Sequence, residues 1–177
     1  MPTNIEIKAR VTDRRAIEKR AAALADSGPQ AIRQEDVFFR VRKGRLKLRY
    51  FGSRRGELIY YEREDSAGPK PSQYIRFPTN RPKELKQALG KALGIAGIVR
   101  KTRYLYLVGN TRIHLDEVEG LGQFLELEVV LSARQTPRQG RQIAARLMER
   151  LGIKSSDLIS GAYVDFLLRR RGKKAGH

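Results

Sequence analysis

Residues 99–131 read VRKTRYLYLVGNTRIHLDEVEGLGQFLELEVVL, and they decide the fold because polar and apolar residues alternate along three successive runs. Strict alternation is typical of a β-strand that packs one face on an apolar core. Two breaks separate the runs, Gly109-Asn110 and the five residues 119–123. A two-residue break of this kind predicts a tight hairpin, and a glycine-containing break of five residues predicts a longer one. We therefore expect antiparallel strands at 99–108, 111–118 and 124–131.

The length of each break determines which residues lie opposite each other. Across the first break the register predicts Arg103 opposite Asp116. Across the second it predicts Asp116 opposite Glu126, and His114 opposite Glu128. A register shift of two residues would change these partners but keep the faces. One continuous polar face then carries Lys101, Arg103, Arg112, His114, Asp116, Glu126 and Glu128.

The rest of the chain predicts shorter strands and several helices. Strands are expected at 4–11, 37–41, 46–51, 58–63 and 73–77, and helices at about 13–26, 82–93, 137–151 and 162–171. Strands grouped between helices predict an α+β fold built on an antiparallel sheet or barrel. The strand at 4–11 and the hairpin at 46–63 are expected to add polar faces that carry Asn4, Glu6, Lys8 and Arg10, and Lys47 and Arg49 with Tyr61 and Arg63.

The composition limits the class of protein. The 177 residues suit one domain, and 37 Lys and Arg against 19 Asp and Glu give a net charge of +18, which favours an anionic partner. Because there is no Cys, disulfides, thiolate metal sites and a cysteine nucleophile are excluded, and hard cations such as Mg²⁺ or Mn²⁺ are favoured. No stretch approaches the roughly 18 apolar residues of a membrane span, and no signal-peptide pattern is present, so we expect a cytoplasmic protein with no membrane partner.

The polar faces carry both signs of charge. Each face alone could be the solvated side of an amphipathic strand. Opposed carboxylates destabilise a sheet, so Asp116 beside Glu126 and Glu128 requires a cation, either Arg103 or a metal ion. Acidic side chains that hold a divalent ion, next to Lys and Arg that hold phosphoryl oxygens, are what metal-bridged phosphate binding needs.

Several short motifs follow one another along residues 5–168. They read Asn4-Ile5-Glu6-Ile7-Lys8, Asp36-x-Phe38-Phe39, Leu46-Lys47-Leu48-Arg49, Val99-x-Lys101-x-Arg103, Arg112-Ile113-x-Leu115-Asp116, Gly120-Leu121-Gly122, Phe124-Leu125-Glu126-Leu127-Glu128 and Gly161-Ala162-Tyr163-Val164-Asp165. In this order and spacing, the chain resembles the CYTH domain family of triphosphate tunnel metalloenzymes, and within it the class IV adenylate cyclase-like branch. We predict a CYTH domain over residues 1–168 and a basic C-terminal tail over 169–177.

The resemblance implies an eight-stranded antiparallel β-barrel with flanking helices, whose inward side chains bind a triphosphate and Mg²⁺ or Mn²⁺. It implies metal ligands at Glu6, Asp116, Glu126 and Glu128, and catalytic roles for Glu6, Lys8, Asp116 and Glu128. It implies triphosphate-binding roles for Lys8, Lys47, Arg49, Arg63, Arg76, Lys101, Arg103 and Arg112. Asn4 stands where the family has its first acidic residue, which leaves open whether one or two metal ions bind.

For the function, the resemblance implies metal-dependent processing of a triphosphate, with conversion of ATP to cyclic AMP and pyrophosphate as the first expectation. Hydrolysis of inorganic, thiamine or nucleoside triphosphate is the alternative, because the same residues would serve both reactions. A non-catalytic basic barrel that binds RNA or another polyphosphate is a third hypothesis, favoured by the charge of +18 but opposed by the carboxylates of the polar face. Homodimer formation is left open by the sequence.

Overall fold

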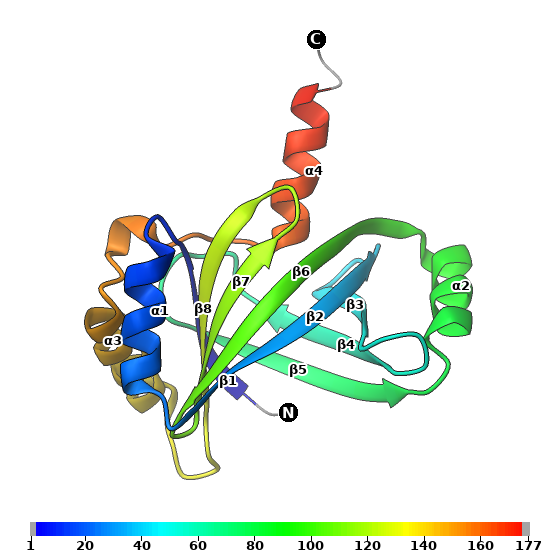
Figure 1. Ribbon diagram of the computed structural model, residues 1–177. Helices are drawn as coiled ribbons and strands as arrows, with labels where there is room; N and C mark the ends of the chain where they lie inside the picture. Colours follow the sequence, from blue (N-terminus) through cyan, green and yellow to red (C-terminus); the bar gives the residue numbers. More distant parts are fainter. Residues whose placement is uncertain (1–2, 175–177) are drawn as a thin grey trace.

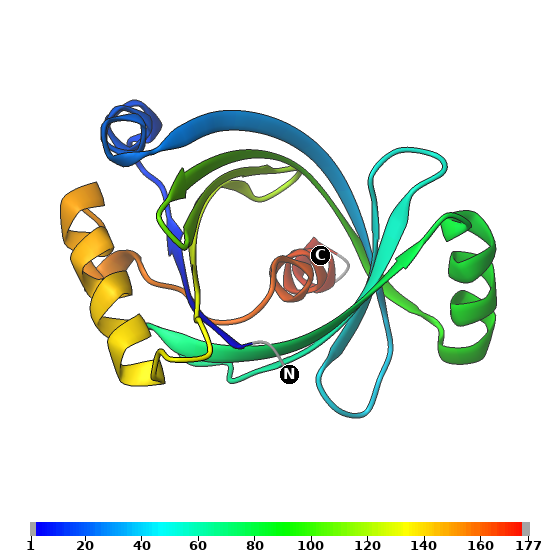
Figure 2. The same cartoon turned by 90° about the horizontal axis from the view of Figure 1, so that it is seen from below.

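The computed structural model describes residues 3–174, which form a closed antiparallel barrel in the order β1-β5-β4-β3-β2-β6-β7-β8 (Figures 1 and 2). The strands are β1 (Thr3–Arg10), β2 (Ser27–Phe39), β3 (Arg45–Tyr50), β4 (Gly56–Arg63), β5 (Lys70–Thr79), β6 (Ile95–Val108), β7 (Thr111–Val118) and β8 (Gly122–Val130). The helices in these residues are α1 (Arg14–Leu24), α2 (Pro82–Leu93), α3 (Pro137–Leu151), the 3₁₀ turn η1 (Ser155–Asp157) and α4 (Tyr163–Lys174). The predicted eight-stranded α+β barrel is confirmed.

The apolar faces of the strands point away from the barrel axis, and helices cover most of them, although Ile75 and Phe77 on the outer face of β5 stay exposed. Helices α1 and α3 pack on one side, where Ile17 and Leu147 contact a cluster that includes Leu125 of β8. Helix α2 lies on the other side, where Leu85 packs near Leu48 of β3. Because the apolar side chains are used on the outside, the polar side chains of the same strands are left to face the lumen.

Helix α4 lies at one end of the barrel, and in Figure 2 it is seen within the outline of the strands. The carbonyl oxygen of Gly161, just before α4, accepts hydrogen bonds from Arg63 at 2.9 Å and from Lys8 Nζ at 3.4 Å. The hydroxyl of Tyr163 donates to Asp116 at 3.1 Å, and its ring centroid lies 4.9 Å from that of Phe124. These contacts join the segment before α4 to the lumen side chains and close this end of the barrel.

The helix starts follow local capping rules. Asp13 accepts a hydrogen bond from the amide of Ala16 and caps α1. Thr136 and Gln139 form a capping box at the start of α3. Helices α2 and α3 begin and end at the predicted residues. No helix among the described residues is long and apolar enough to cross a membrane.

Two predicted registers were wrong by two residues, although the predicted faces are confirmed. In the β7–β8 hairpin Val118 pairs with Gly122, so Asp116 lies opposite Phe124. The loop is shorter than expected because Gly120, at φ +76°, allows a tight turn closed by a hydrogen bond from Leu121 N to the carbonyl of Val118. His114 and Arg112 accordingly lie opposite Glu126 and Glu128.

In the β3–β4 hairpin Tyr50 pairs with Gly56, whereas the prediction paired Phe51 with residue 57. Gly56 enters the strand at a place where a Cβ atom would lie 2.8 Å from Cβ of Pro82, so the packing of α2 selects glycine there. The shift by two residues leaves Lys47 and Arg49 on the same face as Tyr61 and Arg63, as predicted.

The predicted strand at 37–41 was too short, because β2 runs from Ser27 to Phe39. Its first part has polar residues on both faces, such as Arg33 outside and Gln34 inside, and so lacks the alternation of a half-buried strand. The predicted basic tail begins inside α4, which runs to Lys174, and its last residues 175–177 lie outside the described part of the chain.

Candidate active site

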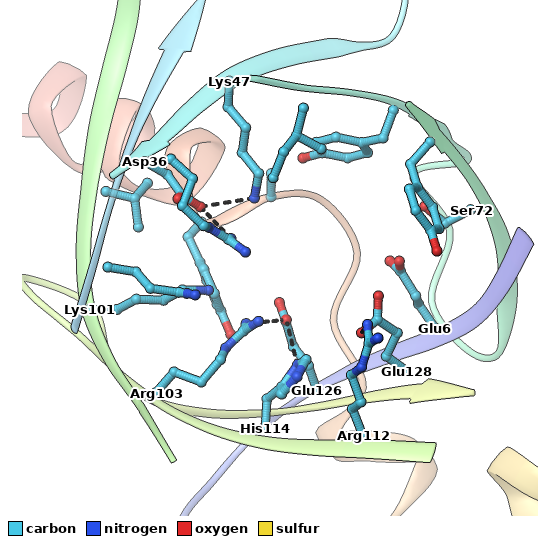
Figure 3. Close-up of a pocket in the computed structure, with 18 of the residues that line it drawn as sticks. Glu6, Asp36, Lys47, Ser72, Lys101, Arg103, Arg112, His114, Glu126 and Glu128 are labelled. Carbon is cyan, nitrogen blue, oxygen red and sulfur yellow. Dashed lines mark hydrogen bonds and ion pairs between the residues drawn. The ribbon is translucent and has the colours of Figure 1, made fainter. Parts of the chain in front are cut away.

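The barrel encloses a cavity of about 310 Å³, which lies at the lower end of the range for small-ligand sites. Figure 3 shows charged side chains that reach from the strands toward an open centre. All the side chains predicted to bind a triphosphate line this cavity: Lys8, Lys47, Arg49, Arg63, Arg76, Lys101, Arg103 and Arg112. The structure thereby brings this predicted set together, and the roles of its members stay predictions.

The cavity has an excess of positive charge. Eight Lys and Arg side chains line it, against the five acidic side chains of Glu6, Asp36, Glu57, Glu126 and Glu128. In the low-dielectric interior of a barrel, unbalanced charges interact more strongly than in water. A polyanion that entered the lumen would therefore meet a preformed, attractive field.

Asp116 is on the lumen face of β7 but is fully buried and does not border the cavity, and it holds two of the cations. Its carboxylate accepts hydrogen bonds from Lys101 Nζ at 3.0 Å and from Arg103 Nε and a terminal nitrogen at 2.7 Å each. Tyr163 adds a further donor, and the Asp116 side chain is fully buried. Burial works to raise the pKa of Asp116, but Arg103 and Lys101 outweigh it and hold the pKa well below its usual range. In this geometry Asp116 fixes the heads of Lys101 and Arg103, and its predicted metal-ligand role stays a prediction.

Glu126 lies between cations from two sides of the barrel. Its carboxylate is 3.0 Å from Lys8 Nζ and 2.6 Å from a terminal nitrogen of Arg103. These partners outweigh the effect of burial and keep the pKa of Glu126 well below its ordinary value. Lys8 also lies 3.9 Å from the ring centroid of Tyr163, so the end of its side chain is confined on two sides.

A second acid holds cations on β3. Asp36 of β2 accepts hydrogen bonds from Lys47 Nζ at 2.9 Å and from two nitrogens of Arg49 at 2.7 Å each. Burial works to raise the pKa of Asp36, but Arg49 and Lys47 hold it well below its usual range. The pKa of Lys47 is lowered to about 7, because burial and the nearby Arg49 outweigh the attraction of Asp36. Lys47 is therefore a cation whose charge is sensitive to neutral pH.

Glu6 and Glu128 form the acidic part of the lumen. They are directly opposite each other across β1 and β8, and Figure 3 shows them on the same side of the open centre. Arg63 donates to Glu6 at 3.0 Å, and Arg112 donates to Glu128 at 3.0 Å. Even so, burial raises the pKa of Glu6 above its usual value, and Glu128 adds to the rise while Arg63 opposes it. The pKa of Glu128, by contrast, is lowered, because His114 and Arg112 outweigh the burial that would raise it. Glu6 is therefore the member of the pair whose charge is less well compensated.

The donor set of this pair fits a divalent cation that is shared with a substrate. Glu6 and Glu128 offer the hard oxygen ligands that Mg²⁺ and Mn²⁺ prefer. Among residues 3–174, no three acidic or histidine side chains are grouped as a ready metal site. Mg²⁺ is commonly held by one or two carboxylates together with substrate phosphates, so a pair is sufficient when the phosphate supplies further oxygens.

Asn4 adjoins this pair and changes its character. Its side-chain amide donates to Glu128 at 2.6 Å, so the nitrogen orients the carboxylate without adding a charge. The amide oxygen of Asn4 is buried and has no hydrogen-bond partner among the described residues. An amide at this position is a neutral ligand at best, so one carboxylate fewer is available for metal than in the family's motif.

Sequence reasoning missed several residues that shape the site. Asp36, Glu57 and Tyr163 were given no role, although Asp36 and Tyr163 stand inside the quoted motifs. Asp36 could have been found from the alternation along β2, because even-numbered residues of this strand face the lumen and Asp36 lies there beside Arg49. The predicted strand began at residue 37, so it was too short to show this alternation. Arg76, whose face the sequence did not fix, lines the cavity, and it pairs with Glu57 at 2.9 Å.

Comparison with solved structures gives the same fold over nearly the whole chain. The PH1012 protein from Pyrococcus horikoshii OT3 is 28% identical with a TM-score of 0.80, covering 92% of this chain and 98% of that one. A proposed adenylate cyclase from Vibrio parahaemolyticus is 17% identical with a TM-score of 0.78, covering 93% and 97%. HpAC1 from Hippeastrum, a proposed adenylyl cyclase described as having a dominant triphosphatase activity, is 18% identical with a TM-score of 0.63, covering 96% of each chain.

Sequence comparison identifies the family. None of the curated proteins searched has a matching sequence. The family model of the CYTH domain matches residues 2–163, which include every lumen-facing residue described above and the segment that closes the barrel. Since this match extends over far more than half of its length, the chain belongs to the CYTH domain family.

Proposed function

We propose that this chain is a metal-dependent enzyme that binds the polyphosphate of a triphosphate substrate in the barrel and breaks one of its phosphorus–oxygen bonds. The observation that carries the proposal is the closed lumen, where eight Lys and Arg side chains outnumber the acidic ones. A triphosphate is a compact anion with several negative charges, and it matches both the size and the sign of this cavity.

The phosphate-binding cations are held in place before a substrate arrives. Asp116 fixes Lys101 and Arg103, and Asp36 fixes Lys47 and Arg49, through hydrogen bonds of 2.7 to 3.0 Å. Donors that are already oriented toward developing charge stabilise a transition state without reorganisation. In phosphoryl transfer, positioning and charge neutralisation supply most of the catalysis. The two acid-anchored groups therefore serve as the proposed clamp on the phosphoryl oxygens.

Glu6 and Glu128 are the residues that would hold the divalent ion, which when bound would supply charge neutralisation to the phosphate oxygens. Asn4 would keep Glu128 oriented toward the lumen through its 2.6 Å hydrogen bond. Glu126 is placed less well for this role, because two cations, Lys8 and Arg103, pair with its oxygens. Among the described residues, Glu128 has only one cationic partner, Arg112, since Asn4 is neutral. We accordingly propose one ion bound between β1 and β8 as the minimal requirement.

Lys8 is the proposed proton donor to the leaving phosphate. Burial lowers its pKa, and a lowered pKa brings an ammonium group closer to the range in which it can donate a proton during the reaction. Its Nζ lies in the lumen between Glu126 and the Tyr163 ring. Glu128, which faces the cavity from the neighbouring strand β8, is the proposed acceptor of the proton from the attacking group.

The attacking group decides which reaction occurs. In a cyclase the 3′-hydroxyl of ATP attacks the α-phosphorus and releases pyrophosphate, and this is the reaction implied by the resemblance to the class IV branch. In a phosphohydrolase water attacks the terminal phosphorus and releases phosphate. The lumen residues are compatible with both reactions, so only the products formed can identify which one occurs.

The test is to incubate the purified chain with ATP or with inorganic tripolyphosphate, with Mg²⁺ or Mn²⁺, and to separate the products by chromatography. Glu128→Gln removes a lumen carboxylate, and Glu62→Gln is the matched control, because Glu62 makes its ion pair with Lys43 on the outside of the barrel. Cyclic AMP with pyrophosphate identifies a cyclase, and phosphate release identifies a phosphohydrolase.

Either activity should require the metal, be lost in Glu128→Gln and persist in Glu62→Gln. Absence of turnover of both substrates with both metals would contradict the proposal. Polyanion binding that is strongly salt-dependent but independent of metal would instead favour a non-catalytic RNA- or polyphosphate-binding barrel.

A further inference from the structure

Among residues 3–174, the two most exposed large apolar side chains are neighbours on the outer face of β5. Ile75 is 53% exposed and Phe77 is 65% exposed. They lie opposite Tyr60 and Leu58 on the outer face of β4, so the four side chains form one apolar strip. In Figures 1 and 2 the described helices lie at the sides and at one end of the barrel, and none of them covers this strip. A continuous apolar surface that the fold leaves uncovered indicates a contact with another molecule.

Strand β5 also has a free edge, although the barrel is closed. On one side β4 pairs with β5 as far as Thr79, whereas on the other side β1 pairs only with residues 70–73. No strand among the described residues therefore pairs with residues 74–79 on the β1 side. A free strand edge is a ready template for a further strand.

The alternation of hydrogen bonds determines which residues of β5 use this edge. The hydrogen bond from Phe51 N to the carbonyl of Arg55 extends a ladder in which odd-numbered residues of β4 bond to β3. Even-numbered residues of β4 therefore bond to odd-numbered residues of β5, and the even-numbered residues of β5 direct their main-chain groups to the β1 side. The free edge thus offers the N–H and C=O groups of Tyr74 and Arg76 and the C=O of Pro78.

The charge of this surface indicates what can bind to it. In a chain with a net charge of +18, all outward residues of β5 are uncharged: Pro71, Gln73, Ile75, Phe77 and Thr79. A nucleic acid or an acidic protein would be bound by cations, and this face has none. Two copies of a strongly basic chain repel each other, so they can come into contact only where neither presents charge.

An antiparallel pair of identical strands is related by a two-fold axis, so the same edge can serve both copies. We infer that β5 pairs with β5 of a second copy of this chain, and that this pairing forms the homodimer that the sequence left open. The inference does not depend on the proposed function, because the outer face of β5 lies outside the lumen.

The register of the pair follows by exclusion. Only even-numbered residues can face each other through hydrogen bonds, and residues 70–73 are already paired with β1. A register with Arg76 opposite Arg76 of the partner subunit would oppose like charges, and one with Pro78 opposite Pro78 of the partner subunit would lack an N–H donor. The remaining register places Arg76 N–H against the carbonyl of the partner's Pro78, and Phe77 opposite the partner's Phe77 on the two-fold axis.

The first experiment measures the mass of the chain by analytical ultracentrifugation. A contact along one strand edge is smaller than the roughly 1,200 Å² of a standard interface, so the dissociation constant of the dimer should be micromolar. The wild-type chain should change from monomer to dimer between about 1 and about 200 µM. Phe77→Asp should weaken the dimer at least about 30-fold, because it places two like charges on the two-fold axis. Since Phe77 is exposed in the single chain, the Tm of this variant should stay within about 2 °C of the wild type.

The second experiment tests the register with single cysteines, because the chain has no Cys of its own. Phe77→Cys should form an intermolecular disulfide on oxidation with diamide, since residues opposite each other in a non-hydrogen-bonded pair have Cα atoms about 4.5 Å apart. Ile75→Cys is the matched control on the same face. Its Cα would lie about 14 Å along the strands from that of the partner's residue 75, which is too far for a disulfide.

A wild-type chain that stays monomeric up to about 200 µM would overturn the inference. A dimer that Phe77→Asp leaves intact would also overturn it, because the contact would then lie elsewhere on the molecule. Equal cross-linking of Phe77→Cys and Ile75→Cys would contradict the proposed pairing of the strands. None of these results bears on triphosphate processing, since no lumen residue is changed.

Discussion

Replacing Asp116 by Asn should destabilise the chain and at the same time make its stability more dependent on a bound polyanion. The substitution keeps the shape of the side chain but removes the negative charge that Lys101 and Arg103 share at 2.7 to 3.0 Å. The Asp116 side chain is fully buried and the Arg103 side chain is only 8% exposed, so water cannot replace the lost anion. The two cations would remain buried with less compensation.

The size of the effect follows from the burial of the pair. Removing one partner of a buried ion pair costs about 3–5 kcal/mol. For a chain of this length, each kcal/mol lowers Tm by about 2–4 °C, which gives a fall of about 6–20 °C. Glu126, which stays 2.6 Å from Arg103, supplies part of the missing charge and favours the lower half of that range. The folded-state pKa of Asp116 is depressed, so its stabilisation is present above the ordinary carboxyl pKa of about 4 and is lost as the pH falls below it.

Differential scanning calorimetry with and without tripolyphosphate, in the absence of metal, is the assay. A ligand at 100 times its dissociation constant stabilises a protein by about 2.7 kcal/mol, or about 5–11 °C here. The rise in Tm on adding tripolyphosphate should be larger in Asp116→Asn than in the wild type, because the polyanion takes the place of the lost carboxylate. Asp65→Asn, which removes an exposed carboxylate that pairs with Arg45, is the control and should shift Tm by about 4 °C at most. A variant Tm within about 2 °C of the wild type, or a smaller ligand shift, would refute the reasoning.

Three further outcomes are expected. Because the pKa of Lys47 is about 7, its charge is lost as the pH rises, and the dissociation constant for tripolyphosphate should increase by up to about tenfold per pH unit above 7. Calorimetric titration should show that the dissociation constant depends less on pH in Lys47→Arg than in the wild type. The same pH dependence in both proteins would contradict the role of this cation. Glu6→Gln should weaken Mn²⁺ binding in the presence of tripolyphosphate at least about tenfold. Electron paramagnetic resonance measures this affinity, and an unchanged value would exclude Glu6 as a ligand. Thr136→Ala removes the capping box of α3 and should lower the free energy of unfolding by about 1 kcal/mol. The value of kcat should not change, because α3 lies outside the barrel. A loss of turnover without a loss of stability would contradict this purely structural role of Thr136.

The lumen faces could be predicted from sequence because a β-strand has a side-chain period of two. Lys101, Arg103 and Asp116 were assigned to one face by parity alone, and this assignment tolerates a register shift of two residues. The register itself was less predictable. Gly120 allows a tighter turn than the length of the break implied, so the partners of His114 and Glu128 changed while their faces did not.

Features that depend on other parts of the chain were not predictable. The first half of β2 is polar on both faces, and its strand conformation is set by pairing with the long strand β6, more than sixty residues away. The closing segment before α4 reaches the lumen through Gly161 and Tyr163, whose contacts with Lys8 and Asp116 join parts of the chain that are far apart in sequence. Local patterns contain no information on such distant contacts, since propensity and periodicity describe only neighbours along the chain.

The most direct test of the central claim is a crystal structure of the chain with tripolyphosphate and Mn²⁺, using the anomalous signal of the metal. The polyphosphate should lie in the lumen against Lys101, Arg103 and Lys47, with one Mn²⁺ between the carboxylates of Glu6 and Glu128. Polyphosphate bound only to basic side chains on the outside of the barrel, with a lumen free of both ligand and metal, would contradict the claim that this barrel is a triphosphate-processing site.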